Sequence, residues 1–209
     1  MNIISVLNPK GGSGKTTLAV HLADALQRTD RTLLVDSDIQ GSARDWRAAG
    51  DSPLPVIGLD RPSLDKDVLS VGADYQWVVI DGASKLEKMV AAAVKASDLI
   101  LIPIQPSPLD IWACASLVEV IQTRQKVTDG TPVAAFVLTR VKKNTMLARD
   151  ALRAIQEFGL PVFHGSIHDR TAFARTLASG QTVLDSEPDG EAAWEIRHLE
   201  KQVREAFSE

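Results

Sequence analysis

A glycine-rich segment near the start of the chain carries lysines and threonines in a spacing that suits phosphate binding. Residues 8–17 read Asn-Pro-Lys-Gly-Gly-Ser-Gly-Lys-Thr-Thr. Glycines let backbone N–H groups approach phosphate oxygens, and a helix that begins here adds its positive N-terminus. We therefore expect Lys15 to contact the β- and γ-phosphates of a nucleotide and Thr16 to ligate Mg²⁺. The other expected nucleotide contacts of this segment are Gly11, Gly12, Ser13, Gly14 and Thr17.

Three aspartates follow short apolar runs further along the chain. Asp36 and Asp38 come after Thr32–Val35, and Asp81 directly follows Trp77–Ile80. A carboxylate at the end of a buried strand can reach Mg²⁺, often through water. Alone, such a residue is equally typical of an acidic turn, but beside a phosphate loop it predicts a metal site. We expect Asp81 to serve that site and Asp36 to support either the Mg²⁺ shell or the loop.

These residues require strands that end at one edge of a sheet, and the hydrophobic pattern predicts such strands. Runs such as Val78–Ile80 and Leu99–Ile102 are apolar at every position, as strands covered on both faces are. The expected strands are Asn2–Leu7, Thr32–Val35, Trp77–Ile80, Leu99–Pro103, Val133–Leu138 and Pro161–His164. The expected helices between them are Thr16–Arg28, Leu86–Ala96, Leu109–Val127 and Met146–Phe158. The alternation predicts an α/β fold, a doubly wound, mostly parallel sheet flanked by helices, with the ligand beyond the carboxyl ends of the strands.

Length and composition limit the other possibilities. The 209 residues fit a single domain over 1–209, and 44% hydrophobic with 24% charged residues is ordinary for a globular protein. The single cysteine, Cys114, rules out an intrachain disulfide and a cysteine-held metal cluster within one chain. No apolar run approaches the roughly 20 residues of a membrane span, and the first residues do not form a signal peptide. We expect a cytoplasmic protein.

The last segment, Glu191–Phe207, predicts a helix that packs on the core through one apolar stripe. The residues assigned to this stripe are Trp194, Ile196, Leu199, Val203 and Phe207. A membrane-targeting helix would carry a strongly basic polar face, whereas this helix mixes glutamates with its basic residues. We therefore expect no membrane binding.

The segment from Lys10 to Thr17 resembles the deviant Walker A loop of the ParA/MinD family of ATPases, whose first lysine is the family signature. Pro9 occupies the position where the usual loop has its first glycine. The resemblance covers nearly the whole chain, with the motifs in the family order. It implies a P-loop NTPase fold and ATP or ADP with Mg²⁺ as cofactors. It also implies an ATP-bound homodimer in which Lys10 contacts the phosphates held by the other subunit.

The aspartate segments fit the same family. Residues 36–41 resemble its Asp-x-Asp-x-Gln-Gly segment, whose second aspartate helps to position the attacking water. We therefore assign Asp38 to ATP hydrolysis, a reaction that depends on positioning and charge neutralisation. After Asp81 many relatives continue with Thr-Pro-Pro, whereas this chain continues with Gly-Ala-Ser, which resembles the small plasmid-type members. Which residue of that loop senses the γ-phosphate stays open.

Two further segments resemble segments of the family that lie near the nucleotide base and the dimer interface. Ile102–Asp110 resembles the proline-rich loop of plasmid partition ATPases, which implies that Pro106 lies near the nucleotide and the dimer interface. Thr139 and Arg140 follow the expected strand Val133–Leu138, where the family contacts adenine, largely through backbone. Both assignments rest on the resemblance.

ParA proteins bind DNA non-specifically, and such binding needs only contacts to phosphates. Because the net charge of this chain is −4, any DNA contact would require a local basic patch. The expected DNA-binding residues are Lys142, Lys143, Arg149, Arg170 and Arg175. A solvated basic face is an equally good explanation for any one of them.

The sequence thus predicts an ATP-dependent dimerisation switch that binds non-specific DNA and drives plasmid or chromosome partition. Its slow ATP hydrolysis would be stimulated by a ParB-type centromere-binding partner, and the ATP-bound form would associate with the nucleoid. We expect no N-terminal helix-turn-helix domain, because one residue precedes the first expected strand.

Other functions remain open. One is a ParA-like ATPase that positions another cargo, such as a protein microcompartment or a chemoreceptor cluster. Another is a MinD-like regulator that cycles on and off membranes. Lys10 disfavours a ligase of the dethiobiotin synthetase type, and the cysteine content disfavours an iron–sulfur reductase, which would need two cluster cysteines per subunit.

Overall fold

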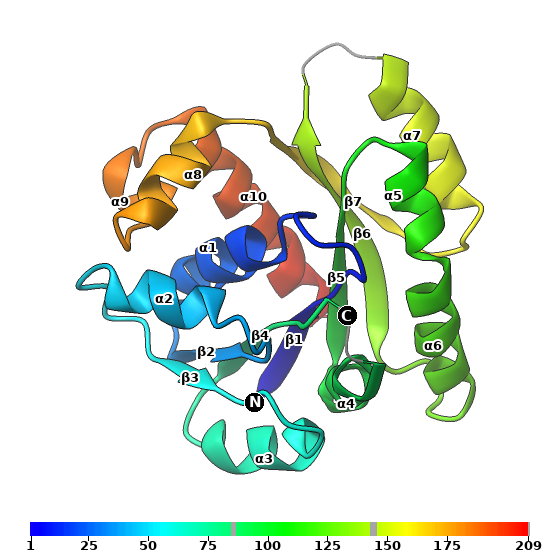
Figure 1. Cartoon of the computed structure of the whole chain (residues 1–209), viewed down its shortest axis with the longest axis horizontal. Helices are drawn as coiled ribbons and strands as arrows, with labels where there is room; N and C mark the ends of the chain where they lie inside the picture. Colours follow the sequence, from blue (N-terminus) through cyan, green and yellow to red (C-terminus); the bar gives the residue numbers. More distant parts are fainter. Residues whose placement is uncertain (85–86, 143–145, 209) are drawn as a thin grey trace.

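The computed structural model describes residues 1–84, 87–142 and 146–208, and of residues 146–149 the backbone. Within these residues seven strands form one sheet in the order β3-β2-β4-β1-β5-β6-β7, and each adjacent pair is parallel (Figure 1). The strands are β1 (Asn2–Val6), β2 (Thr32–Asp36), β3 (Val56–Gly58), β4 (Trp77–Asp81), β5 (Leu99–Ile104), β6 (Val133–Val141) and β7 (Val162–His168). Because β1 lies in the middle, the segment that follows it emerges beside the ends of β4 and β5, which is where such sheets bind ligands.

Helices cover both faces of this sheet (Figure 1). One face carries α1 (Lys15–Gln27), α2 (Ser42–Ala48), α8 (Thr171–Ala178), α9 (Val183–Ser186) and α10 (Glu191–Ala206). The other carries α3 (Leu64–Val71), α4 (Glu87–Ala96), α5 (Pro108–Ala113), α6 (Ala115–Lys126) and α7 (Met146–Gln156). The predicted fold, a doubly wound sheet flanked by helices, is confirmed.

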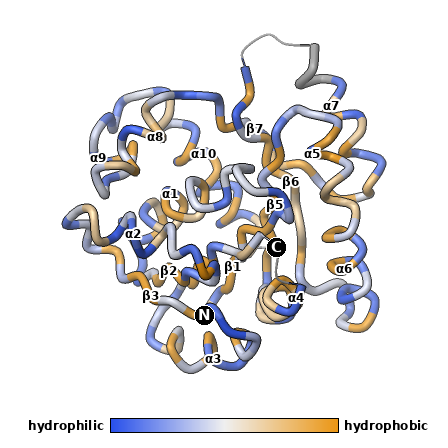
Figure 2. The backbone as a smooth tube through the Cα atoms, in the orientation of Figure 1, coloured by the Kyte–Doolittle hydropathy of each residue, from blue (hydrophilic) through white to orange (hydrophobic). Residues whose placement is uncertain are grey.

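Successive residues of the central strands alternate between the two helical layers. In β4, Val78 and Ile80 pack in the core under α3 to α7, whereas Trp77 and Val79 pack in the core under α1 and α10. Figure 2 shows apolar residues along the strands and on the helix sides that cover them. Both faces of each central strand are therefore buried, which explains why these strands read as continuous apolar runs.

Short elements and element ends differ from the expectations. The helix expected over Leu109–Val127 is two helices, α5 and α6, that meet at Cys114. β6 and β7 run further than expected, to Val141 and His168. β3, α2, α3, α8 and α9 were not predicted, because eight residues or fewer give too little periodicity to identify an element. The expected first residue of α4, Leu86, lies outside the described residues.

The C-terminal helix α10 packs on the core, but its buried side differs from the predicted stripe. Ile196, Leu199 and Val203 are buried, whereas Trp194 is 61% exposed. The neighbouring Glu195 is buried instead and is only 6% exposed. In the part of the chain that the structure describes, no helix is long and apolar enough to cross a membrane.

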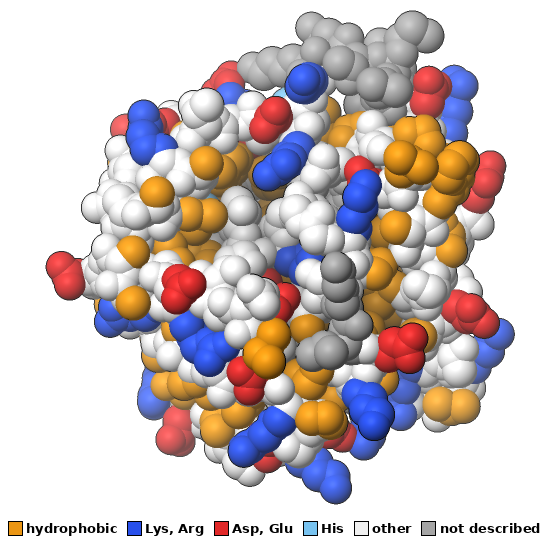
Figure 3. Space-filling model, in the orientation of Figure 1, with side chains coloured by type: hydrophobic (Ala, Val, Ile, Leu, Met, Phe, Trp, Pro, Cys, Tyr) orange, Lys and Arg blue, Asp and Glu red, His pale blue; other side chains and the backbone are white. Residues whose placement is uncertain are grey.

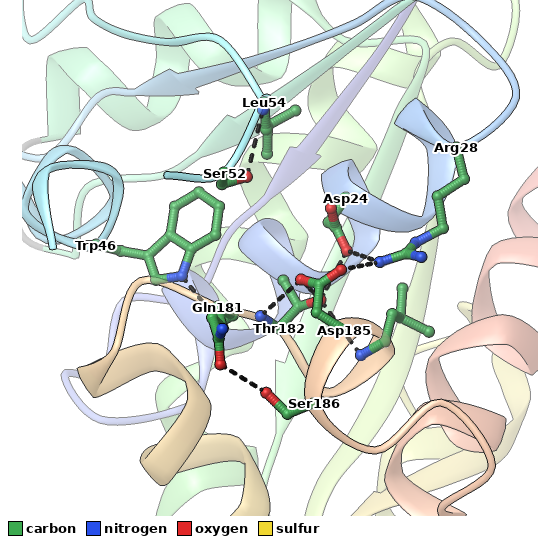
Figure 4. A network of polar contacts seen from close by, with 10 residues as sticks. Asp24, Arg28, Trp46, Ser52, Leu54, Gln181, Thr182, Asp185 and Ser186 are labelled. Atoms are coloured by element: carbon green, nitrogen blue, oxygen red, sulfur yellow. Dashed lines mark hydrogen bonds and ion pairs between the residues drawn. The ribbon is translucent and has the colours of Figure 1, made fainter. Parts of the chain in front are cut away.

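A polar network fixes the segment between α8 and α9 against α1 and α2 (Figure 4). The Thr182 hydroxyl caps α9 and donates a hydrogen bond of 2.7 Å to Asp24 of α1, which is 4% exposed. The indole N–H of Trp46 in α2 donates to the carbonyl of Gln181 at 3.0 Å. The C-terminal helices are thus attached to the helix that starts at the glycine-rich segment.

Candidate nucleotide-binding site

Residues 9–16, called the phosphate loop below, connect β1 to α1. Gly12 and Gly14 have φ angles of +74° and +95°, a region that residues with a Cβ rarely adopt. A Cβ at Gly12 would meet no atom within 4 Å, so conformation rather than crowding requires glycine there. Gly14 is the N-cap of α1, so the unpaired backbone N–H groups of the first helical turn face the loop. This geometry fits an anion.

Lys15 is folded into the phosphate loop. The residue is 7% exposed, and its ammonium group donates to the carbonyl oxygen of Lys10 at 3.1 Å. Burial lowers the pKa of Lys15, while the carboxylates of Asp81 and Asp38 act in the opposite direction. The hydroxyl of Ser13 is also buried, without a hydrogen-bond partner among the described residues. A phosphate group here would satisfy both the buried cation and the buried hydroxyl.

Thr16 and Asp81 meet between the phosphate loop and the end of β4. The Thr16 hydroxyl donates to one carboxylate oxygen of Asp81 at 2.7 Å, and the other oxygen is buried without a partner in the described chain. Burial raises the pKa of Asp81 to about 7, although the hydrogen bond from Thr16 offsets part of this effect. A hydroxyl beside an unpartnered carboxylate oxygen fits Mg²⁺, whose charge would favour the ionised carboxylate.

The described protein groups supply only part of a Mg²⁺ coordination shell. Among residues 1–84, 87–142 and 146–208 there is no group of three or more His, Cys, Asp or Glu residues that could hold a metal ion. Mg²⁺ commonly takes one or two protein groups, and substrate phosphates and water complete its shell. Thr16 and Asp81 match that arrangement.

Asp36 and Asp38 follow β2 at the neighbouring strand end. Asp36 is fully buried, and its oxygens accept the backbone N–H groups of Asp38, Ala43 and Arg44 at 3.0–3.1 Å. Asp36 therefore holds the turn and the start of α2, which favours its expected role in supporting the loop over direct metal binding. Asp38 is half-buried, accepts the N–H of Gln40 at 3.0 Å, and lies close enough to Lys15 to affect its pKa.

Lys10, the first lysine of the phosphate loop, forms an ion pair with Asp110 of α5. The side chain of Asp110 is 7% exposed and that of Lys10 is 43% exposed. The segment before α5 contacts the loop a second time, because Gln105 donates to the carbonyl of Gly12 at 2.9 Å. Within one chain, Lys10 is thus held by α5.

A cavity of about 120 Å³, called the base-side cavity below, lies beside the phosphate loop under the ends of β6 and β7. It is lined by Gly14 and Thr17, by Thr139 and Arg140 of β6, and by Phe173 of α8. The structure thus brings the two predicted adenine-contacting residues next to the phosphate loop. Its position and size suit part of a nucleoside attached to phosphates in the loop.

The end of β6 has an unusual backbone. Arg140 has a φ angle of +50°, a conformation that is uncommon for residues other than glycine and often occurs at functional sites. The preceding Thr139 donates through its hydroxyl to the carbonyl of Ser13 at 3.0 Å. Pro106 lines a hollow of about 280 Å³ between α5 and α7, together with Trp112.

The sequence did not identify the residues that β7 and α8 contribute to the base-side cavity. Ile167, His168 and Asp169 line it together with Phe173. The expected strand ended at His164, before these residues. The irregular pairing of β6 with β7 leaves partly exposed residues in the strand, so its apolar pattern is interrupted.

Among the predicted DNA-binding residues whose side chains the structure describes, two are paired with glutamates. Arg170 pairs with Glu195 and Glu191, and Arg175 pairs with Glu187. Lys142 is exposed directly after β6. Lys143 lies outside the described residues, and for Arg149 the structure gives only a backbone position in α7. On the face seen in Figure 3, acidic and basic side chains are interspersed rather than segregated.

The chain matches a family model described as the CobQ/CobB/MinD/ParA nucleotide binding domain over residues 4–183. It is 30% identical over 206 residues to the maintenance of carboxysome distribution protein A of Halothiobacillus neapolitanus, covering 96% of this chain and 95% of that protein. The protein of the same name from Gloeobacter kilaueensis is 38% identical over 189 residues, covering 87% of this chain and 83% of the relative. A protein named ParA from Rhizobium radiobacter is 26% identical, covering 86% and 84%.

Solved structures agree with the fold. The apo form of McdA from Cyanothece superposes with a TM-score of 0.82 at 18% identity, covering 99% of each chain. MinD from Aquifex aeolicus superposes with a TM-score of 0.74 at 19% identity, covering 98% of this chain and 97% of the other. At these identities the similarity establishes a shared fold.

Proposed function

The chain belongs to the CobQ/CobB/MinD/ParA nucleotide-binding family, and we propose that it is an ATP-driven switch that positions a protein assembly within the cell. It is an ATPase of the ParA type, with ATP or ADP and Mg²⁺ as its cofactors. The proposed kind of cargo, a protein assembly, rests on one observation. Most of the chain is similar to two proteins named for carboxysome distribution.

In this proposal the phosphate loop binds the nucleotide. Lys15 neutralises the β- and γ-phosphates, and the N–H groups of the loop hold their oxygens. Thr16 and Asp81 hold Mg²⁺, which screens the phosphate charge. Asp38 orients the attacking water from the neighbouring strand end, and Asp36 keeps the turn in place for it. The buried, unpartnered oxygen of Asp81 supports this assignment.

The switch itself is a change in self-association. Lys10 leaves Asp110 and contacts the phosphates bound by a second copy of the chain, and Pro106 approaches the same nucleotide from its hollow beside α5. A ligand shifts an equilibrium only through its different affinity for the two states, so the γ-phosphate must bind the dimer more tightly than the monomer. The ion pair between Lys10 and Asp110 favours the monomer.

Partition of plasmids or chromosomes is the second candidate. It is favoured by the relative named ParA, whose identity of 26% is lower than that of the two carboxysome distribution proteins. It would require a ParB-type partner and non-specific DNA binding. Arg170 and Arg175 are paired with glutamates, so in this candidate function they would have to leave these partners to contact DNA phosphates.

The two candidates differ in the cargo, so the cargo is what the experiment must follow. We would delete the gene in cells that encode this chain, label a protein assembly encoded beside it, and follow plasmid inheritance in the same strain. The proposal predicts that the assembly loses its regular spacing while plasmid inheritance is unchanged. Complementation with the Lys15→Ala variant should fail to restore the spacing, because this variant lacks the ammonium group that neutralises the γ-phosphate.

The opposite pattern would replace the proposal by its alternative. Loss of plasmids with normal spacing of the assembly would indicate DNA partition. Restoration of the spacing by Lys15→Ala would contradict an ATP-driven switch for either cargo.

A further inference from the structure

Glu195 is a buried carboxylate in α10 that accepts hydrogen bonds from the turn between β7 and α8. Its Oε1 accepts from His168 Nδ1 at 2.8 Å and from Arg170 Nε and Nη2 at 3.0 and 2.6 Å. Its Oε2 accepts from the backbone N–H of His168 at 3.1 Å. The side chain is 5% exposed, and a buried carboxylate is stable only when it is paired in this way.

The same turn forms a wall of the base-side cavity. His168, Asp169 and Arg170 line the cavity together with Thr17 of α1. Glu195 lies behind this wall and is not itself among the lining residues. It therefore contacts the residues that would face a nucleobase rather than the nucleobase.

The position of Glu195 is unusual for its helix. Its neighbours on the buried side of α10, Ile196 and Leu199, belong to the apolar core. An apolar residue at 195 would leave the Arg170 guanidinium without its buried partner. The carboxylate thus serves the turn between β7 and α8.

We propose that Glu195 is a positioning residue for nucleobase recognition, which acts by fixing His168 and Arg170 in the wall of the base-side cavity. The inference rests on the proposed function in one respect, namely that the ligand of the site is a nucleotide. It assigns Arg170 to the wall of this cavity and not to DNA. In this proposal the C-terminal helix α10 contributes to the selectivity of the site for its nucleobase.

The test compares ligands with and without a base. Binding of ATP, GTP and inorganic tripolyphosphate, each with Mg²⁺, is measured by calorimetry for the wild-type chain and for Glu195→Gln. The amide keeps the shape of the side chain but loses its charge and faces several donors with an NH₂ group. We expect ATP affinity to fall about tenfold and the preference for ATP over GTP to shrink by a similar factor. Affinity for tripolyphosphate should stay within about twofold, because the phosphate loop is unchanged.

Glu191→Gln is the matched control. Glu191 lies one turn earlier on α10 and pairs with the same Arg170, but its side chain is 63% exposed. Exposed pairs contribute little, so its ATP affinity and base preference should match the wild type within about twofold. If Glu195→Gln does not fold, Arg170→Lys serves instead. It keeps the charge but cannot make the two-nitrogen contact, and the same loss of base preference is expected in smaller measure.

Two results would overturn the inference. One is an equal loss of ATP and tripolyphosphate affinity in Glu195→Gln, which would indicate a general structural role. The other is an unchanged ratio of ATP to GTP affinity in a folded variant. Both readouts are independent of cargo, so a chain that selects adenine through Glu195 but positions no protein assembly would refute only the proposed function.

Discussion

On the phosphate side of the site, Asp38 and Asp81 lie within two residues of the ends of β2 and β4, and Lys15 begins the helix that follows β1. The base side instead combines the ends of β6 and β7 with α8, and Glu195 of α10 holds the turn between β7 and α8. The first side depends on local chain geometry, the second on contacts between distant segments. We therefore expect phosphate binding and the choice of base to be separable in this molecule.

The two sides meet at His21 of α1. Its ring is fully buried and packs edge-on against Phe173 of the base-side cavity, with ring centroids 5.1 Å apart and planes at 82°. His21 Nδ1 lies 2.8 Å from the carbonyl oxygen of Thr17, one turn away. Substitutions on either side of this contact can therefore test whether the two sides act separately.

The largest effect should come from removing the buried cation of the phosphate side. Lys15→Ala leaves the phosphate loop without its ammonium group, so affinity for Mg²⁺-bound ATP should fall roughly 10²- to 10³-fold. Tripolyphosphate affinity should fall equally, because the lost contact is to phosphate. Calorimetry with both ligands measures this. Lys10→Ala is the control, since Asp110 holds Lys10 within one chain, and monomer affinity should change less than about threefold.

The next effect separates hydrolysis from binding on the same side. Asp38→Asn should lower the rate of ATP hydrolysis about 10²-fold, because the amide cannot orient the water as a carboxylate does. Its affinity for ATP should stay near the wild-type value. Steady-state phosphate release and a binding titration provide the two readouts. Asp60→Asn is the control, because Asp60 is more exposed and pairs with the nearby Arg44. A parallel loss of binding and hydrolysis in Asp38→Asn would contradict its assigned role.

The contact between the two sides predicts a pH dependence of stability. Burial lowers the pKa of His21 to about 4, whereas the unfolded chain has the ordinary value of 6.5. The unfolded state therefore binds more protons between these values, and stability present above about pH 6.5 is lost as the pH falls toward 4. At pH 5 the loss should be on the order of 2 kcal/mol relative to pH 7.

Urea unfolding at pH 7 and pH 5, compared with His21→Asn, isolates this contribution. The asparagine amide can donate to the carbonyl of Thr17 in place of Nδ1 but does not titrate. The variant should therefore lose less stability than the wild type between the two pH values. Equal losses in both proteins would contradict a buried neutral histidine.

The smallest effect concerns the attachment of the C-terminal helices to α1. Thr182→Ala removes the cap of α9 and the hydrogen bond to Asp24, and it should lower the free energy of unfolding by roughly 1–2 kcal/mol (Figure 4). Ser186→Ala, four residues later, removes only an exposed hydrogen bond and should change it by less than about 0.5 kcal/mol. Chemical unfolding measures both. A large loss of unfolding free energy in Ser186→Ala would contradict the attachment of the C-terminal helices through Thr182.

The phosphate side could be predicted from the sequence because its groups follow from local rules. The glycine-rich turn after β1 determines the position of Lys15 and Thr16, and the end of β4 determines that of Asp81. Neither position depends on contacts with distant segments. The parallel order of the strands, which the alternation with helices predicts, then brings them together. The fold and its central strands followed from the same local patterns.

On the base side, the resemblance predicted Thr139 and Arg140, but the contributions of β7, α8 and α10 could not be predicted, because their contacts join distant segments. Periodicity assigned Trp194 to the buried stripe of α10, but the neighbouring Glu195 is buried and Trp194 is exposed. Only the donors of His168 and Arg170, from another element, make burial of that carboxylate favourable. The pairing of Arg170 likewise could not be read from its charge, and neither could the ion pair that holds Lys10 on Asp110.

The central claim is that the γ-phosphate controls self-association through Lys10. Sedimentation velocity of the Asp38→Asn variant, which should hold ATP without rapid hydrolysis, tests it directly in ATP and in ADP with Mg²⁺. The account predicts a species of about twice 22.6 kDa in ATP and the monomer in ADP. It also predicts a monomer in ATP when Lys10→Ala is added. The same mass in both nucleotides, or a dimer that persists without Lys10, would contradict the account.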